Sequence, residues 1–358
     1  MKERRLMKGN EAFAEAAISA GCRYYYGYPI TPQNEITEYM SREMPKAQGA
    51  FIQAESELAA ISMAYGSAAA GGRVLISSSS PGIALMQEGI SFMCSADVPV
   101  VLLNVSRCGP GIGGIQPGQA DYFQATRGGG NGDYHVIVYA PASIQETADK
   151  MSEAFDIADE YRAPVMMLVD GMLGQMMEPV SIPERISDSE IAKKSSEKHW
   201  ALAGHGDKRG KNTVRSLRLK TDDLEASIEE RGKKYDRAEK ELLEYETIGL
   251  DDADIVFTAF GSTARIVKET MSILSAEGIK SGLIRPVSLW PFPYEAFDCL
   301  SDKTKVVISV ELSKGQLIQD VKLGVLGRKP VELIYRTGGA LLTPDEVAEN
   351  AKKILEVQ

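Results

Sequence analysis

The stretch AESELAAISMAYGSAAAGGR, residues 54–73, decides the fold of this chain. Its small and apolar residues recur at helical spacing, which predicts a helix over 56–70 with one face built for close packing. That face carries Glu57, Ala60, Ile61, Ala64 and Ala68. A carboxylate in the first turn can simply interact with the helix dipole, or it can be a functional acid held against a packed surface. Glu55 points elsewhere and is the weaker candidate.

Short β-rich runs alternate with helical patterns around this stretch, which predicts an α/β domain with a parallel sheet and helices on both faces. The candidate strands are 22–28, 49–54, 73–79, 98–105, 134–140 and 164–170. The candidate helices are 9–20, 32–44, 56–70, 83–95 and 143–161. After a break the alternation returns, with strands at 253–259, 280–285, 304–310 and 331–335 and helices at 262–277, 314–326 and 343–356.

This pattern divides the chain into three parts. Residues 1–185 are expected to form the first domain, 186–250 an irregular excursion with a connecting helix, and 251–358 a second, smaller α/β domain. Two domains suit 358 residues, because domains usually hold about 100–200. The polar, Lys-rich stretch 186–220 is expected to be an irregular surface excursion. Residues 221–246 are expected to form a solvated connecting helix, with a partner-binding helix as the alternative.

Composition and charge narrow the class of function. Hydrophobic residues make up 44% and charged residues 25%, as in an ordinary globular protein. The formal net charge of −10 and the lack of a long basic run argue against binding nucleic acid or an anionic membrane. No run approaches the roughly 18 apolar residues of a membrane span. The start, MKERRLMKGNEAFAEAA, lacks the apolar core of a signal peptide, so a cytoplasmic location is expected.

Cysteine and histidine do not form a metal site in the sequence. The cysteines are widely scattered, at Cys22, Cys94, Cys108 and Cys299. No C-x-x-C pair occurs, which excludes the usual zinc and iron–sulfur spacings on this chain and gives little support to disulfides. Surface or structural roles are expected for the three histidines, His135, His199 and His205.

Three further motifs stand where predicted strands end, which is where α/β folds bind ligands. They are GYPITP (27–32), SSSSPGIALMQEG (77–89) and VSRCGPGIGG (105–114). Thr31 offers a hydroxyl near a helix start, with a plain helix cap as the alternative. Arg107 suits the recognition of a carboxylate, with an internal salt bridge as the alternative. The glycines do not spell G-x-G-x-x-G, so no nicotinamide fingerprint is present.

Together and in this order, these motifs resemble the alpha-type, pyrimidine-binding subunit of the 2-oxoacid:ferredoxin oxidoreductases. Among them the chain most closely resembles the subunit of the 2-oxoisovalerate, branched-chain enzyme. The resemblance covers nearly the whole chain, including GYPITPQNEI, FIQAESELAAISMAYG, GQADYFQATRGGGNGDYHVIVYAPAS and, near the C-terminus, GLIRPVSLWPFP. It implies a thiamine-diphosphate-binding fold followed by a smaller, transketolase C-terminal-like α/β domain.

The resemblance also assigns roles by position. Glu57 matches the glutamate that activates thiamine diphosphate through its aminopyrimidine ring, while Thr31 and Arg107 match residues near the substrate carboxylate. The residues expected at the cofactor are Tyr28, Pro29, Ile30, Ser79, Ser80, Pro81 and Gly82. Gly128 to Asp133 match a family motif without an assigned contact, and they could be a structural turn.

What the chain lacks points to partner subunits. Thiamine enzymes hold Mg²⁺ and the diphosphate with Gly-Asp-Gly followed by Asn, and here Asp133 and Asp170-Gly171 stand in unsuitable contexts. The resemblance therefore implies a diphosphate-binding beta-type subunit that carries Mg²⁺, a ferredoxin-like subunit that carries iron–sulfur clusters, and a gamma-type subunit as a further component. The cofactor should lie between chains, and no metal is expected on this one.

The implied reaction is the oxidative decarboxylation of a branched-chain 2-oxoacid with coenzyme A, which yields acyl-CoA, carbon dioxide and reduced ferredoxin. A 2-oxoglutarate enzyme is the first alternative, and pyruvate and indolepyruvate enzymes share the scaffold. Two alternatives of another class are a non-catalytic scaffold subunit and one half of a transketolase-type synthase, which needs no ferredoxin subunit.

Overall fold

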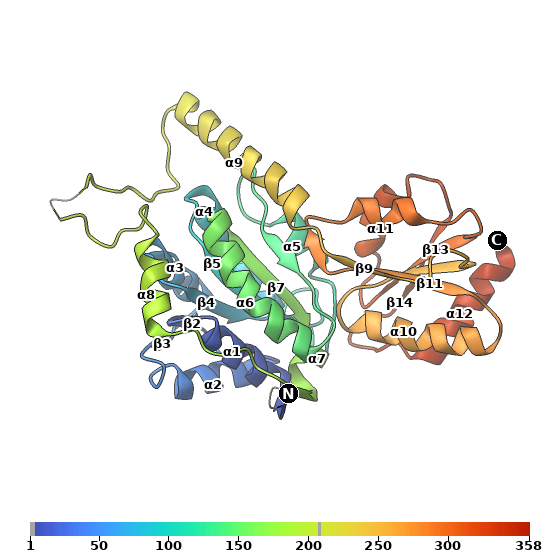
Figure 1. Ribbon diagram of the computed structural model, residues 1–358. Helices are drawn as coiled ribbons and strands as arrows, with labels where there is room; N and C mark the ends of the chain where they lie inside the picture. The colour runs from blue at the N-terminus through green and yellow to red at the C-terminus, as the bar shows by residue number, and fades with distance from the viewer. Residues whose placement is uncertain (1–3, 207–208) are drawn as a thin grey trace.

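The computed structural model describes residues 4–206 and 209–358, which form two α/β bodies (Figure 1). The first is built on a seven-stranded sheet in the order β12-β6-β7-β5-β4-β2-β3. Six strands are parallel: β2 (Tyr24–Gly27), β3 (Ala50–Gln53), β4 (Val74–Ser78), β5 (Val100–Ser106), β6 (Ile137–Tyr139) and β7 (Pro164–Asp170). The edge strand β12 (Ser288–Trp290) runs antiparallel to β6.

Helices cover both faces of this sheet, as predicted. On one face α1 (Gly9–Ser19) packs against α2 (Asn34–Glu43) and α6 (Ile144–Tyr161). On the other face α3 (Glu57–Ala69) packs against α4 (Ser80–Ser95). Right-handed crossovers explain the division, because the chain moves along the sheet in one direction through α3 and α4 and in the other through α2 and α6.

The second body is a five-stranded sheet in the order β14-β13-β10-β11-β9, with only β9 antiparallel. Its strands are β9 (Tyr245–Ile248), β10 (Ile255–Thr258), β11 (Ser281–Pro286), β13 (Val306–Glu311) and β14 (Val331–Tyr335). Its helices are α10 (Gly261–Ala276), α11 (Leu317–Val325) and α12 (Pro344–Val357).

Every predicted strand and helix is present, and the structure adds short elements that the sequence pattern did not indicate. These are the ribbon of β1 (Arg5–Lys8) and β8 (Met177–Val180), the strands β9 and β12, the helices α5 (Tyr122–Arg127), α7 (Gly171–Gln175) and α8 (Asp188–Ser196), and the 3-10 helix η1 (Tyr294–Cys299). The prediction that 186–220 is irregular was wrong for α8, which the Ser187 hydroxyl caps at Glu190 N. The strand β12 lies in the second part of the chain but joins the first sheet. The strand β9, at the end of the connecting segment, joins the second sheet. The division at 185 and 250 stays a prediction.

The long helix α9 (Thr221–Glu241) connects the bodies and is mostly exposed. Its basic residues hold it to the C-terminal ends of two other helices, where carbonyl oxygens lack helical partners. Arg231 donates to Ser95 O at the end of α4 (3.2 Å). Lys234 donates to Arg162 O after α6 (3.2 Å) and to the carboxylate of Asp97 (2.6 Å).

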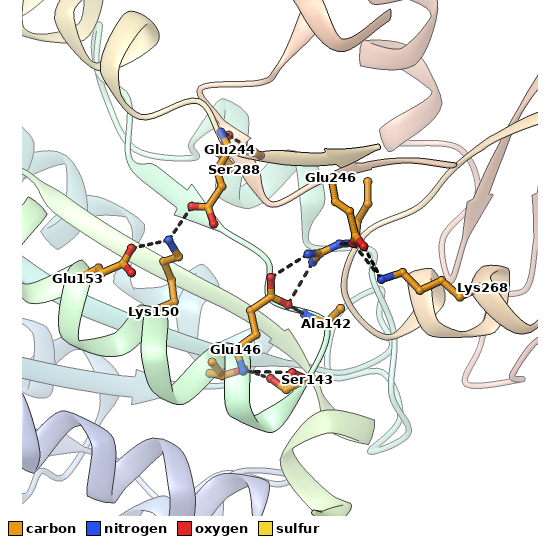
Figure 2. Close-up of polar contacts among 11 residues, drawn as sticks. Ala142, Ser143, Glu146, Lys150, Glu153, Glu244, Glu246, Lys268 and Ser288 are labelled. Carbon is orange, nitrogen blue, oxygen red and sulfur yellow. Dashed lines mark hydrogen bonds and ion pairs between the residues drawn. The ribbon is translucent and has the colours of Figure 1, made fainter. Parts of the chain in front are cut away.

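A charged network ties the second body to α6 (Figure 2). Arg285 of β11 donates to both carboxylate oxygens of Glu146 on α6, at 3.1 and 2.9 Å, and to Glu246 on β9 at 2.7 Å. Lys268 of α10 also donates to Glu246 (2.8 Å). Burial would raise the pKa of Glu246, but these hydrogen bonds from Lys268 and Arg285 outweigh it and lower the pKa.

We expect Arg285→Ala to lower the free energy of unfolding by about 3 kcal/mol, because it leaves two carboxylates without their buried partner. Since the pKa of Glu246 is lowered by folding, the stabilisation by Glu246 is present above its ordinary pKa of 4.5 and is lost as the pH falls through the lowered value. Urea unfolding curves recorded at a series of pH values from about 3 to about 7 measure both effects. The control is Lys352→Ala, whose exposed pair with Glu277 should contribute within about 0.5 kcal/mol. Equal losses in both variants would contradict the expectation.

Candidate active site

The predicted motifs meet at the carboxyl edge of the first sheet. After β2 the chain moves to β3 on one side of it and then to β4 on the other, so the strand order reverses around β2. Such a switch point opens a crevice where α/β proteins bind ligands. The Tyr28–Pro32 loop, the start of α4 and Arg107 all follow strands that end at this edge.

Glu57 opens α3, and Ser56 caps the helix by accepting a hydrogen bond from Ala59 N (3.2 Å). The Glu57 side chain is 7% exposed, and it has no hydrogen bond or ion pair within 4–206 and 209–358. It faces the first turn of α4, since a Cβ atom built on Gly82 would lie 2.7 Å from Glu57 Oε1 and overlap Ser78 Oγ. Only glycine at 82 allows these two helix starts to meet.

Unpaired hydroxyls lie beside this contact. Ser78 and Ser79 are fully buried, and neither hydroxyl has a hydrogen-bond partner among the described residues. Ser79 occupies the N-cap position of α4 without capping it. A buried unpaired polar group costs about 1–3 kcal/mol, so these two hydroxyls are available to form hydrogen bonds with a polar ligand.

Arg107 connects the start of α4 to the Tyr28–Pro32 loop. The Ser80 hydroxyl donates to Arg107 O (3.1 Å) and accepts from Arg107 N (2.9 Å). The guanidinium donates to Thr31 O (2.9 Å) and Ile112 O (2.8 Å), and its buried Nε is unpaired among the described residues. The predicted alternative of an internal salt bridge is therefore absent at Arg107 in the described structure, and Thr31 contributes its backbone carbonyl.

The Tyr28–Pro32 loop is held by hydrogen bonds through Gln33 on one side and is exposed on the other. Ser77 donates to the amide oxygen of the buried Gln33 (2.7 Å), and the Gln33 amide nitrogen reaches Tyr28 O (3.5 Å). Tyr28 and Pro29 are exposed, while Ile30 and Thr31 are half-buried. Their predicted roles at the cofactor and substrate stay predictions.

Two residues that the sequence reasoning missed join the site. Asn104, at the end of β5, donates to the carboxylate of Asp121 (2.8 Å). Burial raises the pKa of Asp121, with hydrogen bonds from Ser80 and Asn104 opposing the rise. Asp121 lies in the motif GQADYF, which can be recognised in the sequence. The position of Asp121 next to Ser80, however, depends on packing between residues distant in the chain.

A cavity of about 610 Å³ leads from this site to the second body. Its lining includes Ser80, Pro81, Cys108 and Asp121 of the first body and Lys314 of the second. The cavity therefore reaches Ser80 at the start of α4, and residues of both bodies line it.

Residues Gly128 to Asp133 form a turn packed on α4. The Gly129 and Gly130 N–H groups donate to the Tyr134 hydroxyl (3.3 and 2.9 Å), and the Ser91 hydroxyl donates to Asn131 O (2.5 Å). A Cβ atom on Gly130 would lie 2.5 Å from Gln87 O, so this turn needs glycine for close packing. These contacts are structural.

Residues 4–206 and 209–358 contain neither a cluster suited to a metal ion nor a helix suited to cross a membrane. No group of three or more His, Cys, Asp or Glu side chains is arranged to hold a metal ion there. Within the same residues, no helix combines the length and apolar character needed to cross a membrane.

Two family matches cover the two bodies. Residues 15–247 match the family described as pyruvate flavodoxin/ferredoxin oxidoreductase, thiamine diphosphate-binding. Residues 253–347 match core domain II of pyruvate:ferredoxin oxidoreductase. The chain is thus a thiamine-diphosphate-binding α/β protein. It belongs to the 2-oxoacid:ferredoxin oxidoreductase family as an alpha-type subunit, which confirms the family and fold predicted from the sequence.

Individual relatives agree with this assignment. The ketoisovalerate oxidoreductase subunit VorB of Methanothermobacter thermautotrophicus is 44% identical, over 98% of this chain and 97% of the relative. The 2-oxoglutarate synthase subunit KorA of Methanocaldococcus jannaschii is 36% identical, over 95% of this chain and 97% of the relative.

Solved structures show the same arrangement of elements. The 2-oxoglutarate:ferredoxin oxidoreductase of Magnetococcus marinus, with 2-oxoglutarate, coenzyme A and succinyl-CoA bound, superposes with a TM-score of 0.83 at 26% identity. The match covers 99% of this chain and 66% of that longer one. A split-gene transketolase shares the fold alone, with a TM-score of 0.58 at 15% identity.

We expect Gly82→Ala to cost about 1–3 kcal/mol of stability, because the added methyl group forces Glu57 and Ser78 apart in a packed site. It should also remove most turnover of the assembled enzyme, since a shift of about 1 Å at a catalytic group can cost about 10²-fold. Thermal unfolding and turnover measure the two effects. The control is Gly66→Ala in α3, where no atom lies within 4 Å of the new methyl group and a gain of about 0.5–1 kcal/mol is expected. Unchanged melting and turnover in the Gly82 variant would refute the close-approach role.

Proposed function

We propose that this chain supplies Glu57 to a thiamine diphosphate shared with a diphosphate-binding subunit, in an enzyme that oxidatively decarboxylates a branched-chain 2-oxoacid with coenzyme A. The observation that carries the proposal is the Glu57 side chain, which is 7% exposed, has no hydrogen bond or ion pair among the described residues, and lies against Gly82. The products would be acyl-CoA, carbon dioxide and reduced ferredoxin. A cytoplasmic location is proposed with it, since coenzyme A and ferredoxin are intracellular reactants.

The donors and acceptors present suit the pyrimidine half of the coenzyme. Glu57 would hold a proton between its carboxylate and the ring nitrogen, while Ser78, Ser79 and the close approach at Gly82 would position the ring. When bound, thiamine diphosphate supplies the carbon nucleophile and the electron sink that decarboxylation of a 2-oxoacid needs.

The substrate would lie between Arg107 and the cavity. The unpaired Arg107 Nε and the half-buried Thr31 hydroxyl would hold its carboxylate. The Arg107 guanidinium is already fixed by two backbone carbonyls, so little side-chain entropy would be lost on binding. The VorB relatives, 44% identical, support a branched-chain substrate. A second candidate is 2-oxoglutarate, favoured by Lys314 in the cavity wall, which could pair with a second carboxylate.

The remaining groups would come from partners. Within the described residues this chain offers no metal cluster, so Mg²⁺ and the diphosphate are assigned to a beta-type subunit and the iron–sulfur clusters to a ferredoxin-like subunit. A gamma-type subunit is a further proposed component. The beta-type subunit would cover the outer face of α3 and α4, where large apolar side chains are exposed. They are Leu58 (49%), Leu85 (51%) and Phe92 (45%).

Replacing Glu57 with Gln should leave the complex assembled and lower turnover by about 10²-fold or more, because an amide cannot share the proton. The assay is viologen reduction by the reconstituted enzyme with 3-methyl-2-oxobutanoate, 2-oxoglutarate and pyruvate, each with coenzyme A. The control is Glu55→Gln, two residues away on an exposed side chain. Near-normal activity of the Glu57 variant would remove this carboxylate from the mechanism, and a preference for 2-oxoglutarate would select the second candidate.

Replacing Leu85 with Lys should weaken binding of the beta-type subunit by more than about 2 kcal/mol, because it puts a charge at the centre of the proposed apolar contact. The chain alone should melt as before. Calorimetric titration with the purified beta-type subunit measures the affinity. The control is Leu323→Lys on α11, which is 56% exposed and lies in the second body. Equal affinity of both variants would place the contact elsewhere.

A further inference from the structure

A second cavity, of about 270 Å³, lies at the edge of the first sheet opposite Glu57. Two residues of its lining, Asp97 and Arg162, stand shortly before β5 and β7, so the cavity adjoins the N-terminal ends of these strands. The Glu57 site adjoins the carboxyl ends, and the length of β5 separates the two sites by roughly 20 Å. The arginines that line the cavity are Arg162, Arg218, Arg231 and Arg237. We call this space the arginine cavity.

The lining is basic in a chain whose formal net charge is −10. It includes five Lys or Arg side chains and three Asp or Glu side chains. Two of the cations are neutralised, because Lys234 pairs with Asp97 (2.6 Å) and Arg237 pairs with Glu160. The other three, Arg162, Arg218 and Arg231, form no ion pair with any residue that the structure describes. The arginine cavity therefore holds an excess of positive charge.

Arg218 and Arg231 converge on one carbonyl group. Both guanidinium groups donate to Ser95 O, at 3.3 and 3.2 Å. Arg231 is 5% exposed, and its Nε has no hydrogen-bond partner among the described residues. A guanidinium carries five N–H donors and keeps its charge in proteins, so its burial without an acidic partner is costly. The cavity that both side chains line is the space in which an anion can compensate them.

Arg162 joins the other two arginines from the end of α6. Its backbone is left-handed, with φ 48°, which is unfavourable for a residue other than glycine. Its Nε donates to Asp97 O (3.2 Å), and its guanidinium lies 4.5 Å from the centre of the Trp200 ring. A carbonyl and an aromatic ring thus fix this side chain without neutralising it. Arginines fixed in this way lose little side-chain entropy when they bind an anion.

We propose that the arginine cavity binds a phosphoryl group, either as inorganic phosphate or as the phosphate of a small metabolite. Planar guanidinium groups match phosphate oxygens with two parallel hydrogen bonds. The volume lies just below the roughly 300–1,000 Å³ of pockets that enclose drug-sized ligands. It therefore suits a phosphate or diphosphate group better than a whole nucleotide. This site is independent of the reaction proposed above.

A phosphate in the arginine cavity links three segments that are distant in the chain. It bridges Arg231 on α9 to Arg162 after α6 and to Arg218 on the extended segment before α9. Because the chain runs from α9 directly into β9, the same ligand stabilises the connection to the second sheet. The melting temperature of the chain should rise with phosphate concentration, as for any ligand that binds the folded state alone.

Calorimetric titration of the full chain with inorganic phosphate, pyrophosphate and adenosine monophosphate tests the site. We expect phosphate to bind the native chain, and Arg231→Gln and the less buried Arg162→Gln to bind it at least about tenfold more weakly, equivalent to about 1.4 kcal/mol. Tighter binding of adenosine monophosphate than of phosphate would assign the site to a phosphorylated metabolite, and equal binding to the free anion.

A fourth variant should bind phosphate more tightly than the native chain. Glu230 is exposed, lines the arginine cavity and has no ion pair among the described residues. Glu230→Gln removes its negative charge from the lining, so the affinity for phosphate should increase about threefold or more, roughly 0.7 kcal/mol. Misfolding of the variant cannot produce such a gain.

The matched control is Arg215→Gln, in the same basic segment as Arg218 but exposed and outside the lining, which should bind phosphate as the native chain does. A native chain that does not bind phosphate would overturn the proposal. Equal losses in the Arg215 and Arg231 variants would do so too, as would an equal response to potassium chloride. A chain indifferent to phosphate that loses a partner subunit on Arg162→Gln would assign the cavity to a carboxylate of that subunit instead.

Discussion

The site depends on one contact, the meeting of the first turns of α3 and α4 at Glu57 and Gly82. The two helices follow β3 and β4, which flank β2, so their starts converge at the point where the strand order reverses. The alanines of α3 let the helices pack closely behind this point, and glycine at 82 removes the one side chain that would separate them. The contact leaves the Glu57 side chain 7% exposed and without a hydrogen bond or ion pair among the described residues, next to the buried, unpaired hydroxyls of Ser78 and Ser79.

Much of this arrangement was predictable because it is local. The small residues of 56–70 predicted α3 and the position of Glu57 in its first turn, and strand ends predicted where the loops meet. What remained hidden depends on residues distant in sequence. The tie between Asp121 and Asn104 requires the chain to return across β5, and the use of the Thr31 carbonyl by Arg107 depends on the exact path of a loop. No local sequence pattern indicates that β12, which follows strands of the second sheet in the chain, joins the first sheet either.

The two bodies are joined by buried polar groups as well as by apolar packing. Besides Arg285, the fully buried Asp320 of α11 accepts hydrogen bonds from the Tyr122 hydroxyl (2.6 Å), the Tyr294 hydroxyl (2.6 Å) and Arg127 (2.7 Å). Gln119 bonds in turn to Phe260 O and Leu312 N. Residues 119–127 of the first body are therefore fixed to the second, and Asp121 lies in the middle of this segment.

The strand β12 has a mechanical consequence for the cavity. Because Ser288–Trp290 is hydrogen-bonded to β6, the second body cannot swing outward as a rigid unit without unzipping an edge of the neighbouring sheet. The stacking of Trp290 on His135, with ring centres 4.4 Å apart, adds to that resistance. An outward rotation of the second body is therefore an unfavourable way to open the cavity of about 610 Å³. The glycine-rich loop 109–114 borders the cavity through Gly109, Pro110 and Gly111, and unlike β12 this part of its rim is not held in a sheet.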